Sequence, residues 1–156
     1  MNGTTTHLYS EILPNLFMGG TDDSDVISTP KKLHPLNGQP EFDSVVTLYS
    51  HAQPMSWYVH ENRFGFADGP LDAATIQKVE ELAEWLHGQW KIGKKCLIRC
   101  QAGLNRSGVT VARVLMKEGY TADEAIQLIR ERRSPDALCN EEFVKWLKTF
   151  EVEGRW

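Results

Sequence analysis

The segment IRCQAGLNRSG, residues 98–108, places a thiol and a guanidinium at the two ends of a five-residue turn, as Cys100 and Arg106. A short apolar run typical of a buried strand precedes it, and a helical pattern begins at Ser107. An ionised thiol is a nucleophile, and a guanidinium offers a planar fork for two oxygens of a phosphoryl group. These residue types predict covalent phosphoryl transfer, with Cys100 as nucleophile and Arg106 as phosphate clamp.

The turn between these two residues has the composition of an anion-binding loop. Gly103 permits a positive φ angle or a close backbone approach, so that successive N–H groups can curl inward as a nest. The following helix adds its positive N-terminal end, and this field is expected to favour the Cys100 thiolate. Ser107 is placed to donate a hydrogen bond to the sulfur and so to help it leave when water cleaves the thiophosphate. The predicted phosphate-binding residues are Gln101, Ala102, Gly103, Leu104, Asn105 and Arg106.

No metal or nucleotide cofactor is predicted at this loop. The sequence shows no set of His, Cys or carboxylate side chains with metal-ligand spacing. Gly103 and Gly108 give a GxxxxG pattern, but the Lys-Ser/Thr pair of a nucleotide P-loop is missing, which argues against ATP binding. We therefore expect metal-independent chemistry without a cofactor.

The elements that must position the loop are predicted from apolar periodicity. The run KKCLIRC is the strand that leads into it, and FDSVVTLYS (42–50) is rich enough in β-branched residues to predict a central strand. Residues 21–40, rich in Asp, Ser, Pro, Gly and Asn, predict a long loop with one helical turn near residues 30–33. Two further strands are expected, an edge strand at NLFMGG (15–20) and a short strand or extended segment at NRFGFAD (62–68).

Helices are expected to dominate the C-terminal half. Asp72 is a predicted N-cap, and Thr121 with Glu124 forms a predicted capping box. Strands early, helices late and crossovers between them predict an α/β domain in which helices flank a mostly parallel sheet, with a phosphate-binding loop between a strand and a helix. The predicted helices start at Asp72 and end before Gly93, run from Ser107 to Glu118, run from Thr121 to Arg133, and follow Asn140.

Composition limits the class of protein. A chain of 156 residues with 41% hydrophobic and 24% charged residues predicts one soluble globular domain, residues 1–156. Its formal net charge of −4 argues against broad nucleic-acid binding. No apolar run reaches the ~18 residues of a membrane span, and no secretory signal is visible, so we expect a cytoplasmic monomer. Three cysteines do not make a disulfide framework.

A local cluster of cations can outweigh this net charge. The candidates are Arg99, Arg106, Arg130, Arg132 and Arg133. Because cations are favoured near a helix C-terminus, most of residues 130–133 are expected simply to face solvent.

The segment CQAGLNRS is similar to the C-x5-R-S/T signature of the cysteine-dependent protein tyrosine phosphatase superfamily. The rest of the chain resembles the compact dual-specificity branch, with EILPNLFMGG as opening strand, FGFADGP as acid loop and AIQLIRERRSPDALCNEEF as closing segment. The resemblance covers most of the chain in the right order. It implies that Cys100 is the nucleophile, Arg106 the clamp and Asp68 the general acid, and that Ser107 assists departure of the thiolate.

Two features need separate interpretation. Asp72 competes with Asp68 for the acid role, but an N-cap explains Asp72 fully. Members of the resembled family usually carry His before the nucleophile, where this chain has Arg99. We expect the Arg99 side chain to point away from the phosphate and to pair with a carboxylate, which leaves backbone amides to hold the thiolate.

The remaining candidate side chains each have a packing or surface role as the simpler interpretation. Cys96 and Cys139 are expected to fill space in the core, although Cys96 stands four residues before Cys100 and a protective disulfide is the alternative. Rings of the segment SHAQPMSWYVHE are candidates to wall the site and contact an aromatic substrate, with half or more of them expected to serve only packing or surface. Its candidate residues are His51, Trp57, Tyr58 and His60.

The function predicted from these features is hydrolysis of phosphomonoesters on protein Tyr, and on Ser/Thr as a second substrate class, through a cysteinyl-phosphate intermediate. Three alternatives stay open. GLNRSG also resembles the loop of RNA 5′-triphosphatases, whose polyanionic substrate suits an acidic chain poorly. Phosphoinositide phosphatases tend to carry loop lysines that residues 101–105 lack. The non-enzymatic alternative is a phosphate-binding pseudophosphatase.

Overall fold

A five-stranded sheet forms the centre of the molecule in the computed structural model, which describes residues 8–21, 42–55 and 59–152. The strand order is β1-β2-β5-β3-β4, with β1 and β2 antiparallel and every other neighbouring pair parallel. The predicted α/β class with a mostly parallel sheet is therefore confirmed. The strands are β1 (Tyr9–Leu13), β2 (Leu16–Gly19), β3 (Ser44–Thr47), β4 (His60–Arg63) and β5 (Cys96–Arg99).

The expected edge position of residues 15–20 is wrong. Residues 9–13 form β1, which turns at Asn15 (φ 69°) and pairs with β2, so β2 lies between β1 and β5. The half-polar YSEIL sequence of β1 gives a weak strand signal, as is usual at a sheet edge. The predicted loop and helical turn within residues 22–41 lie outside the described residues.

The helices agree closely with the sequence prediction because their caps are local. Asp72 accepts a hydrogen bond from the Thr75 amide (2.8 Å), and both bonds of the capping box between Thr121 and Glu124 are present. The helix predicted to start at Ser107 begins one residue earlier. The helices are α1 (Ala73–Lys91), α2 (Arg106–Glu118), α3 (Ala122–Arg132) and α4 (Glu141–Val152).

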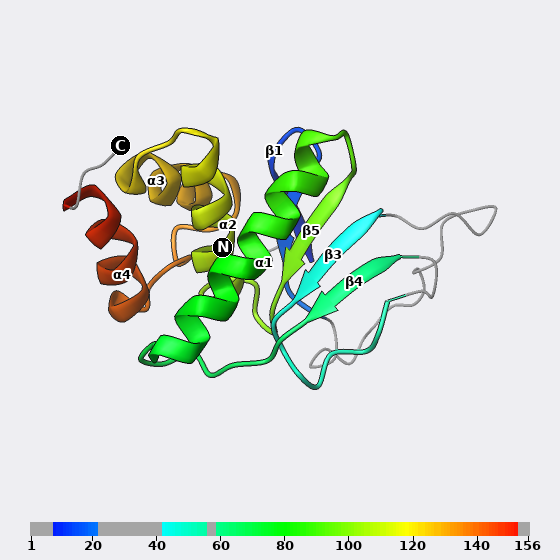
Figure 1. The fold of residues 1–156 in the computed structure, drawn as a ribbon, viewed down its shortest axis with the longest axis horizontal. Coiled ribbons are helices and arrows are strands. Elements are labelled where there is room, and N and C mark those ends of the chain that lie inside the picture. Colours follow the sequence, from blue (N-terminus) through cyan, green and yellow to red (C-terminus); the bar gives the residue numbers. More distant parts are fainter. Residues whose placement is uncertain (1–7, 22–41, 56–58, 153–156) are drawn as a thin grey trace.

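The two faces of the sheet are covered differently. Leu16, Met18, Val46 and Ile98 belong to the large core that also contains the buried residues of the helices. The opposite face carries a smaller cluster with no helix residue among the described ones, namely Phe42, Val45, Val59 and Leu97. In Figure 1 the helices accordingly gather on one side of the sheet, with α1 crossing in front of it. Two members of this second cluster, Phe42 and Val59, lie in the segments just before β3 and β4.

The parallel strands bring several functional segments to one edge of the sheet. β5 ends at Arg99 and leads directly into residues 100–105, and β3 ends beside it at Thr47. β4 starts at His60, earlier than predicted, and ends at Arg63, after which Phe64 and Phe66 stack with their ring centroids 5.9 Å apart. Ligands bind at such carboxyl edges in open α/β sheets.

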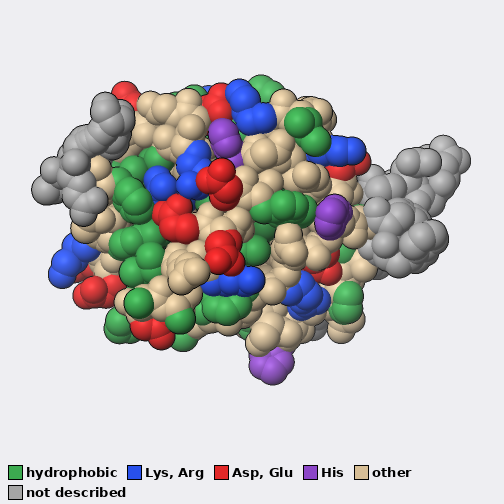
Figure 2. Space-filling view, in the orientation of Figure 1, with side chains coloured by type: hydrophobic (Ala, Val, Ile, Leu, Met, Phe, Trp, Pro, Cys, Tyr) green, Lys and Arg blue, Asp and Glu red, His purple; other side chains and the backbone are tan. Residues whose placement is uncertain are grey.

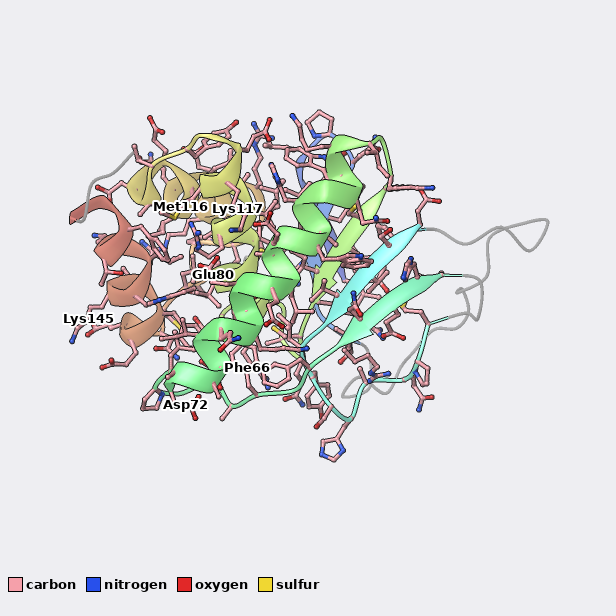
Figure 3. All side chains as sticks on the ribbon, in the orientation of Figure 1. Phe66, Asp72, Glu80, Met116, Lys117 and Lys145 are labelled. Carbon is pink, nitrogen blue, oxygen red and sulfur yellow. The ribbon has the colours of Figure 1, made fainter. Side chains whose placement is uncertain are left out.

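The surface carries a mixture of charges. Figure 2 shows Lys and Arg side chains interspersed with Asp and Glu over the face that it views. One such group joins α1 to α2, where Lys117 lies 3.0 Å from Glu80 (Figure 3). None of the helices within the described residues is long and apolar enough to cross a membrane.

Candidate active site

Cys100 lies at the end of the central strand β5 and is 2% exposed. Its amide donates to the carbonyl of Gly19 on β2 (3.1 Å), which continues the sheet ladder by one residue. The sulfur faces the start of α2, because the Ser107 amide donates to Cys100 Sγ at 3.3 Å and Ser107 Oγ lies 3.3 Å from the same sulfur. The predicted contact of Ser107 with the thiol is thus present in the structure.

The carbonyl groups of the loop point away from its interior. Those of Ala102 and Gly103 accept from the Arg133 guanidinium, at 3.4 and 3.0 Å. The amides on the other side of these peptide planes therefore face the opposite way, toward the concave side of the loop. The same holds for the carbonyls of Gln101, Leu104 and Asn105, which accept from the amides of Thr21 (3.0 Å), Leu138 (3.1 Å) and Val109 (2.8 Å).

Gly103 meets both conditions for which a glycine was predicted. Its φ angle is +76°, and a Cβ atom at this position would come within 2.7 Å of the backbone of residues 19–20 and of the Arg133 guanidinium. Any other residue would strain the backbone and push the loop away from β2. The loop is consequently packed tightly on its outer side.

Arg133 is the exception to the expectation that most of residues 130–133 face solvent. Arg130 and Arg132 are exposed, but Arg133 is only 8% exposed and also donates to Ser10 Oγ (2.9 Å). Burial lowers the pKa of its guanidinium below the ordinary value, and the nearby Cys100 sulfur opposes that shift. No sequence signal distinguished Arg133 from its neighbours, because its partners lie some 30 residues away along the chain.

Arg106, the first residue of α2, projects toward the acid loop. Its Nη1 donates to the carbonyl of Phe66 (2.9 Å), and its guanidinium carbon lies 5.7 Å from the centre of the Tyr49 ring. The side chain is therefore held between two segments of the chain. This arrangement is compatible with a phosphate clamp, since the fork retains further N–H donors.

Asp68 lies at the mouth of the loop and is exposed. Its two carboxylate oxygens accept from Asn105 Nδ2 (2.9 Å) and Asn140 Nδ2 (2.7 Å). Asn105 Oδ1 in turn accepts from the Asn140 amide (3.0 Å). The acid loop, the phosphate loop and the start of α4 thus meet at one carboxylate. Sequence reasoning assigned Asn105 only a backbone role and placed Asn140 only before the last helix.

Asp72 performs the cap that was predicted for it. The hydrogen bonds from Thr75 lower its pKa below the ordinary value, which keeps this carboxylate ionised. Figure 3 shows Asp72 at the first turn of α1. Among the two competing acids, Asp68 is the one in contact with the phosphate loop, through Asn105.

Arg99 behaves as expected. Its side chain is buried beneath the second face of the sheet, 6% exposed, and pairs with the carboxylate of Glu61 at 3.3 Å. It also donates to Thr47 Oγ1 (3.0 Å) and to the carbonyl of Gln53 (2.6 Å). Arg99 therefore points away from the anion loop.

The two other cysteines differ from each other. Cys96 is fully buried, and this burial, with the charge of Asp43, raises its pKa to about 12, which keeps the thiol protonated and poorly nucleophilic. The core-filling role fits Cys96. It does not fit Cys139, which is exposed and whose sulfur lies 3.5 Å from Asn105 Nδ2. The turn before α4, with Leu138 at φ 61°, brings it to the surface.

The expected aromatic wall is present in part. His51 is exposed and lies beside Tyr49, with ring centroids 5.6 Å apart. His60 lies at the opposite end of the sheet, where it packs on Trp85 (5.1 Å), and so takes no part in the site. Trp57 and Tyr58 lie outside the described residues. Within the described part of the chain, no group of three or more His, Cys, Asp or Glu residues could hold a metal ion.

Comparison with known proteins agrees with this geometry. Residues 35–153 match the family model of the dual specificity phosphatase catalytic domain. Dual specificity protein phosphatase 15 of Rattus norvegicus is 26% identical over 142 residues, which cover 90% of this chain and 56% of the rat protein. Dual specificity protein phosphatase 22 of Homo sapiens is 26% identical over 146 residues, covering 91% of this chain and 73% of that protein. The chain thus spans little more than half the length of the rat relative.

Solved structures share the fold across nearly the whole chain. The crystal structure of human DUSP28 superposes with a TM-score of 0.73 at 20% identity and covers 92% of both chains. That of the human tyrosine phosphatase-like serine/threonine/tyrosine-interacting protein gives 0.73 at 23% identity, covering 92% of this chain and 95% of that one. Likeness at this level of identity shows a common fold.

Proposed function

Since the chain belongs to the dual specificity phosphatase catalytic-domain family, whose members are cysteine-dependent phosphatases, we propose that it hydrolyses phosphomonoesters on protein Tyr and, as a second substrate class, on Ser/Thr. The reaction proceeds through a cysteinyl-phosphate at Cys100 and needs no metal. The single observation that carries the proposal is the sulfur of Cys100, enclosed by a loop whose carbonyls are all bonded outward and capped by the Ser107 amide.

The first chemical step forms a sulfur–phosphorus bond. The Cys100 thiolate attacks in line with the leaving oxygen, the phosphorus–oxygen bond breaks, and Asp68 gives its proton to the departing phenol or alcohol. The inward amides of the loop and the Arg106 fork bind the three other phosphoryl oxygens and stabilise their charge in the transition state.

The second step regenerates the enzyme. Water attacks phosphorus, the sulfur–phosphorus bond breaks, and one proton of the water passes to the Asp68 carboxylate. The sulfur leaves as a thiolate, which accepts hydrogen bonds from the Ser107 amide and hydroxyl, both 3.3 Å away. These bonds to a charged acceptor lower the barrier to its departure.

The preference for phosphotyrosine is supported by the rings beside the clamp. Tyr49 lies against Arg106, and His51 lies against Tyr49 on the exposed side. An aromatic leaving group can pack on such a wall, whereas a phosphoserine side chain is shorter.

One assay tests the proposal against its alternatives. Phosphate release is measured with EDTA present from phosphotyrosine and phosphoserine peptides, a 5′-triphosphorylated RNA, phosphoinositides and a generic aryl phosphate. We expect turnover of the phosphotyrosine peptides and the aryl phosphate, and its loss in Cys100→Ser with phosphate affinity retained. Turnover confined to the RNA or to the lipids would reassign the substrate class. Phosphate binding without turnover of any substrate would make the protein a pseudophosphatase.

A further inference from the structure

The sheet face without helices carries a buried group of charged residues directly behind the nucleophile. Arg99 precedes Cys100 in sequence and pairs across the strands with Thr47. Because side chains alternate along a strand, Arg99, Thr47 and Glu61 lie on the same face of the sheet. A buried guanidinium is costly unless its charge and its N–H groups find partners. The partners of Arg99 therefore show which segment of the chain this buried charge stabilises.

Glu61 is the hub of the group, with its side chain only 12% exposed. Its Oε2 accepts from Thr47 Oγ1 (2.6 Å) and from Arg99 Nη2 (3.3 Å). Its Oε1 accepts from the backbone amide of Met55 (3.2 Å). The second cation is Arg63, whose Nη1 lies 3.7 Å from Glu61 Oε2.

Apart from the bond from Arg99 Nε to Thr47 Oγ1 (3.0 Å), the remaining bonds of the two arginines end on one stretch of backbone, residues 49–55. Arg99 donates to the carbonyl of Gln53 (2.6 Å), and Arg63 donates to those of Ala52 (2.6 Å) and Tyr49 (3.5 Å). Within residues 49–55 the side chain of Ala52 is buried, whereas most of the others are exposed. Charged side chains from β4 and β5 therefore hold this segment in place, since few of its own side chains are buried.

The fastened segment forms one side of the candidate active site. Tyr49 lies under the Arg106 guanidinium, and the exposed His51 ring packs on Tyr49. Ser50 abuts Gly65, where a Cβ atom would come within 2.7 Å of the Ser50 side chain, so the segment also touches the acid loop. A shift of residues 49–55 would move the surface that lies next to the phosphate clamp.

We propose that Arg99 and Glu61 are positioning residues for substrate recognition. They hold residues 49–55 so that Tyr49 and His51 present a wall to the aromatic ring of a phosphotyrosine, beyond its phosphoryl group. The position before the nucleophile thus fastens the recognition wall and leaves the phosphate loop to its own backbone bonds. The substrate part of this inference rests on the proposed function.

The test compares Arg99→Met with Arg113→Met. Arg113 is a matched control, since it is also 8% or less exposed and paired, with Nε 2.6 Å from Glu80 Oε2, but on the helical side of the molecule. Both variants lose a buried ion pair, so both are expected to melt at a lower temperature. Glu61→Gln is the milder second variant, because it removes the charge and keeps the shape.

Two readouts separate positioning from general stability. Amide hydrogen exchange in residues 49–55 should accelerate in Arg99→Met and Glu61→Gln and stay unchanged in Arg113→Met. KM for a phosphotyrosine peptide should rise about three- to tenfold in the first two variants, which is the size of one lost aromatic contact. Their kcat and the inhibition constant of inorganic phosphate should stay within about twofold of wild type, because Arg106 remains bonded to the carbonyl of Phe66 and the phosphate loop is held by other bonds.

Three outcomes would contradict the positioning role of Arg99 and Glu61. Unchanged exchange in residues 49–55, or equal KM changes in Arg99→Met and Arg113→Met, would overturn it. A loss of phosphate affinity parallel to the rise in KM would also overturn it, since Arg99 would then act on the phosphate loop. A wild-type protein that turns over no phosphopeptide would defeat the proposed function and the recognition role with it. The exchange comparison would still decide whether Arg99 and Glu61 hold the segment.

Discussion

The phosphate loop and the acid loop meet at the same site but are held in place by different means. Residues 101–105 are fixed through their backbone, with each carbonyl accepting a bond from a neighbouring element and Cys100 only 2% exposed. Asp68 is exposed, and its carboxylate is oriented by the side chains of Asn105 and Asn140. The first loop is held by backbone bonds to several elements, whereas the carboxylate of the second is oriented by two side chains, Asn105 and Asn140.

This difference matches the work proposed for each loop. Charge stabilisation in a transition state is effective when the donors are already aimed before the substrate arrives. Proton donation needs one group within hydrogen-bond reach of the leaving oxygen. Damage to the phosphate loop should therefore slow every substrate alike, and damage to the acid loop should slow only substrates with poor leaving groups.

The largest effect is expected for Arg106→Lys. Lysine keeps the positive charge but loses the planar fork and its contact with Tyr49. We expect kcat to fall on the order of 10³-fold or more for every substrate, as for other arginines that stabilise phosphoryl transfer. Single-turnover rates with an aryl phosphate and a phosphopeptide measure this. A variant that keeps more than a tenth of the wild-type rate would show that charge alone suffices at this position.

Asp68→Asn should sharpen the contrast between the loops. Without a proton to give, it should slow phosphotyrosine and alkyl phosphates by roughly 10²–10⁴-fold and activated aryl phosphates far less. Asp72→Asn is the control, because Asn is nearly as good an N-cap as Asp and the bond from Thr75 can persist.

The measurement for this pair is kcat as a function of the pKa of the leaving group. Wild type and Asp72→Asn should show a shallow dependence, and Asp68→Asn a steep one. A steep dependence in Asp72→Asn, with Asp68→Asn resembling wild type, would reverse the assignment of the acid.

Arg133→Met tests the backbone-held loop from its outer side. The substitution removes the donor to the carbonyls of Ala102 and Gly103, and the unsatisfied carbonyl of the buried Gly103 costs roughly 1–3 kcal/mol. A slightly displaced loop can lose up to about 10²-fold in rate. We expect kcat to fall by the same factor for good and poor leaving groups, together with a lower melting temperature. A loss confined to poor leaving groups would instead place the action of Arg133 on the acid loop.

The helical parts of this fold were predictable because their signals are local. The caps at Asp72 and Thr121 join residues three positions apart, and both are present as predicted. The loop itself was predictable for a similar reason. Gly103 and the start of a helix after Arg106 define a nest within a few residues, and the observed φ of +76° agrees with it.

The side chains that hold the two loops in place could not be predicted, because they are distant in sequence from the residues that they contact. Arg133 reaches Gly103 across 30 positions, and Asn140 reaches Asp68 across 72. A single sequence gives no means of pairing such residues, so Arg133 was not distinguished from its neighbours at 130–133, most of which were expected to face solvent. The expectation for Arg99 succeeded for a general reason, since a cation that ends a buried strand needs a carboxylate, but the identity of Glu61 as partner came only from the structure.

The smallest expected effect, and the sharpest test of the acid loop, comes from Asn140. Its Nδ2 donates to Asp68 (2.7 Å) and lies 3.4 Å from the carbonyl of Gly69, while its Oδ1 accepts from the amides of Glu142 and Phe143 at the start of α4. Asn140→Ser preserves the cap and removes the donor, so the melting temperature should change little. Because this bond to the carboxylate is exposed, its loss should cost near the lower end of about 1.5–3 kcal/mol, which is roughly a tenfold loss of kcat for poor leaving groups.

Two further variants determine whether this loss passes through Asp68. Asn140→Asp also keeps the cap but turns a second carboxylate toward Asp68, so it should impair poor leaving groups more than Asn140→Ser does. In an Asp68→Asn background, Asn140→Ser should have almost no additional effect, because the group that it orients is already disabled. Additive losses in the double variant, or equal losses for good and poor leaving groups, would mean that Asn140 acts through Asn105 on the phosphate loop. The phosphate loop and the acid loop would then move together, and they would differ only in how deeply their residues are buried.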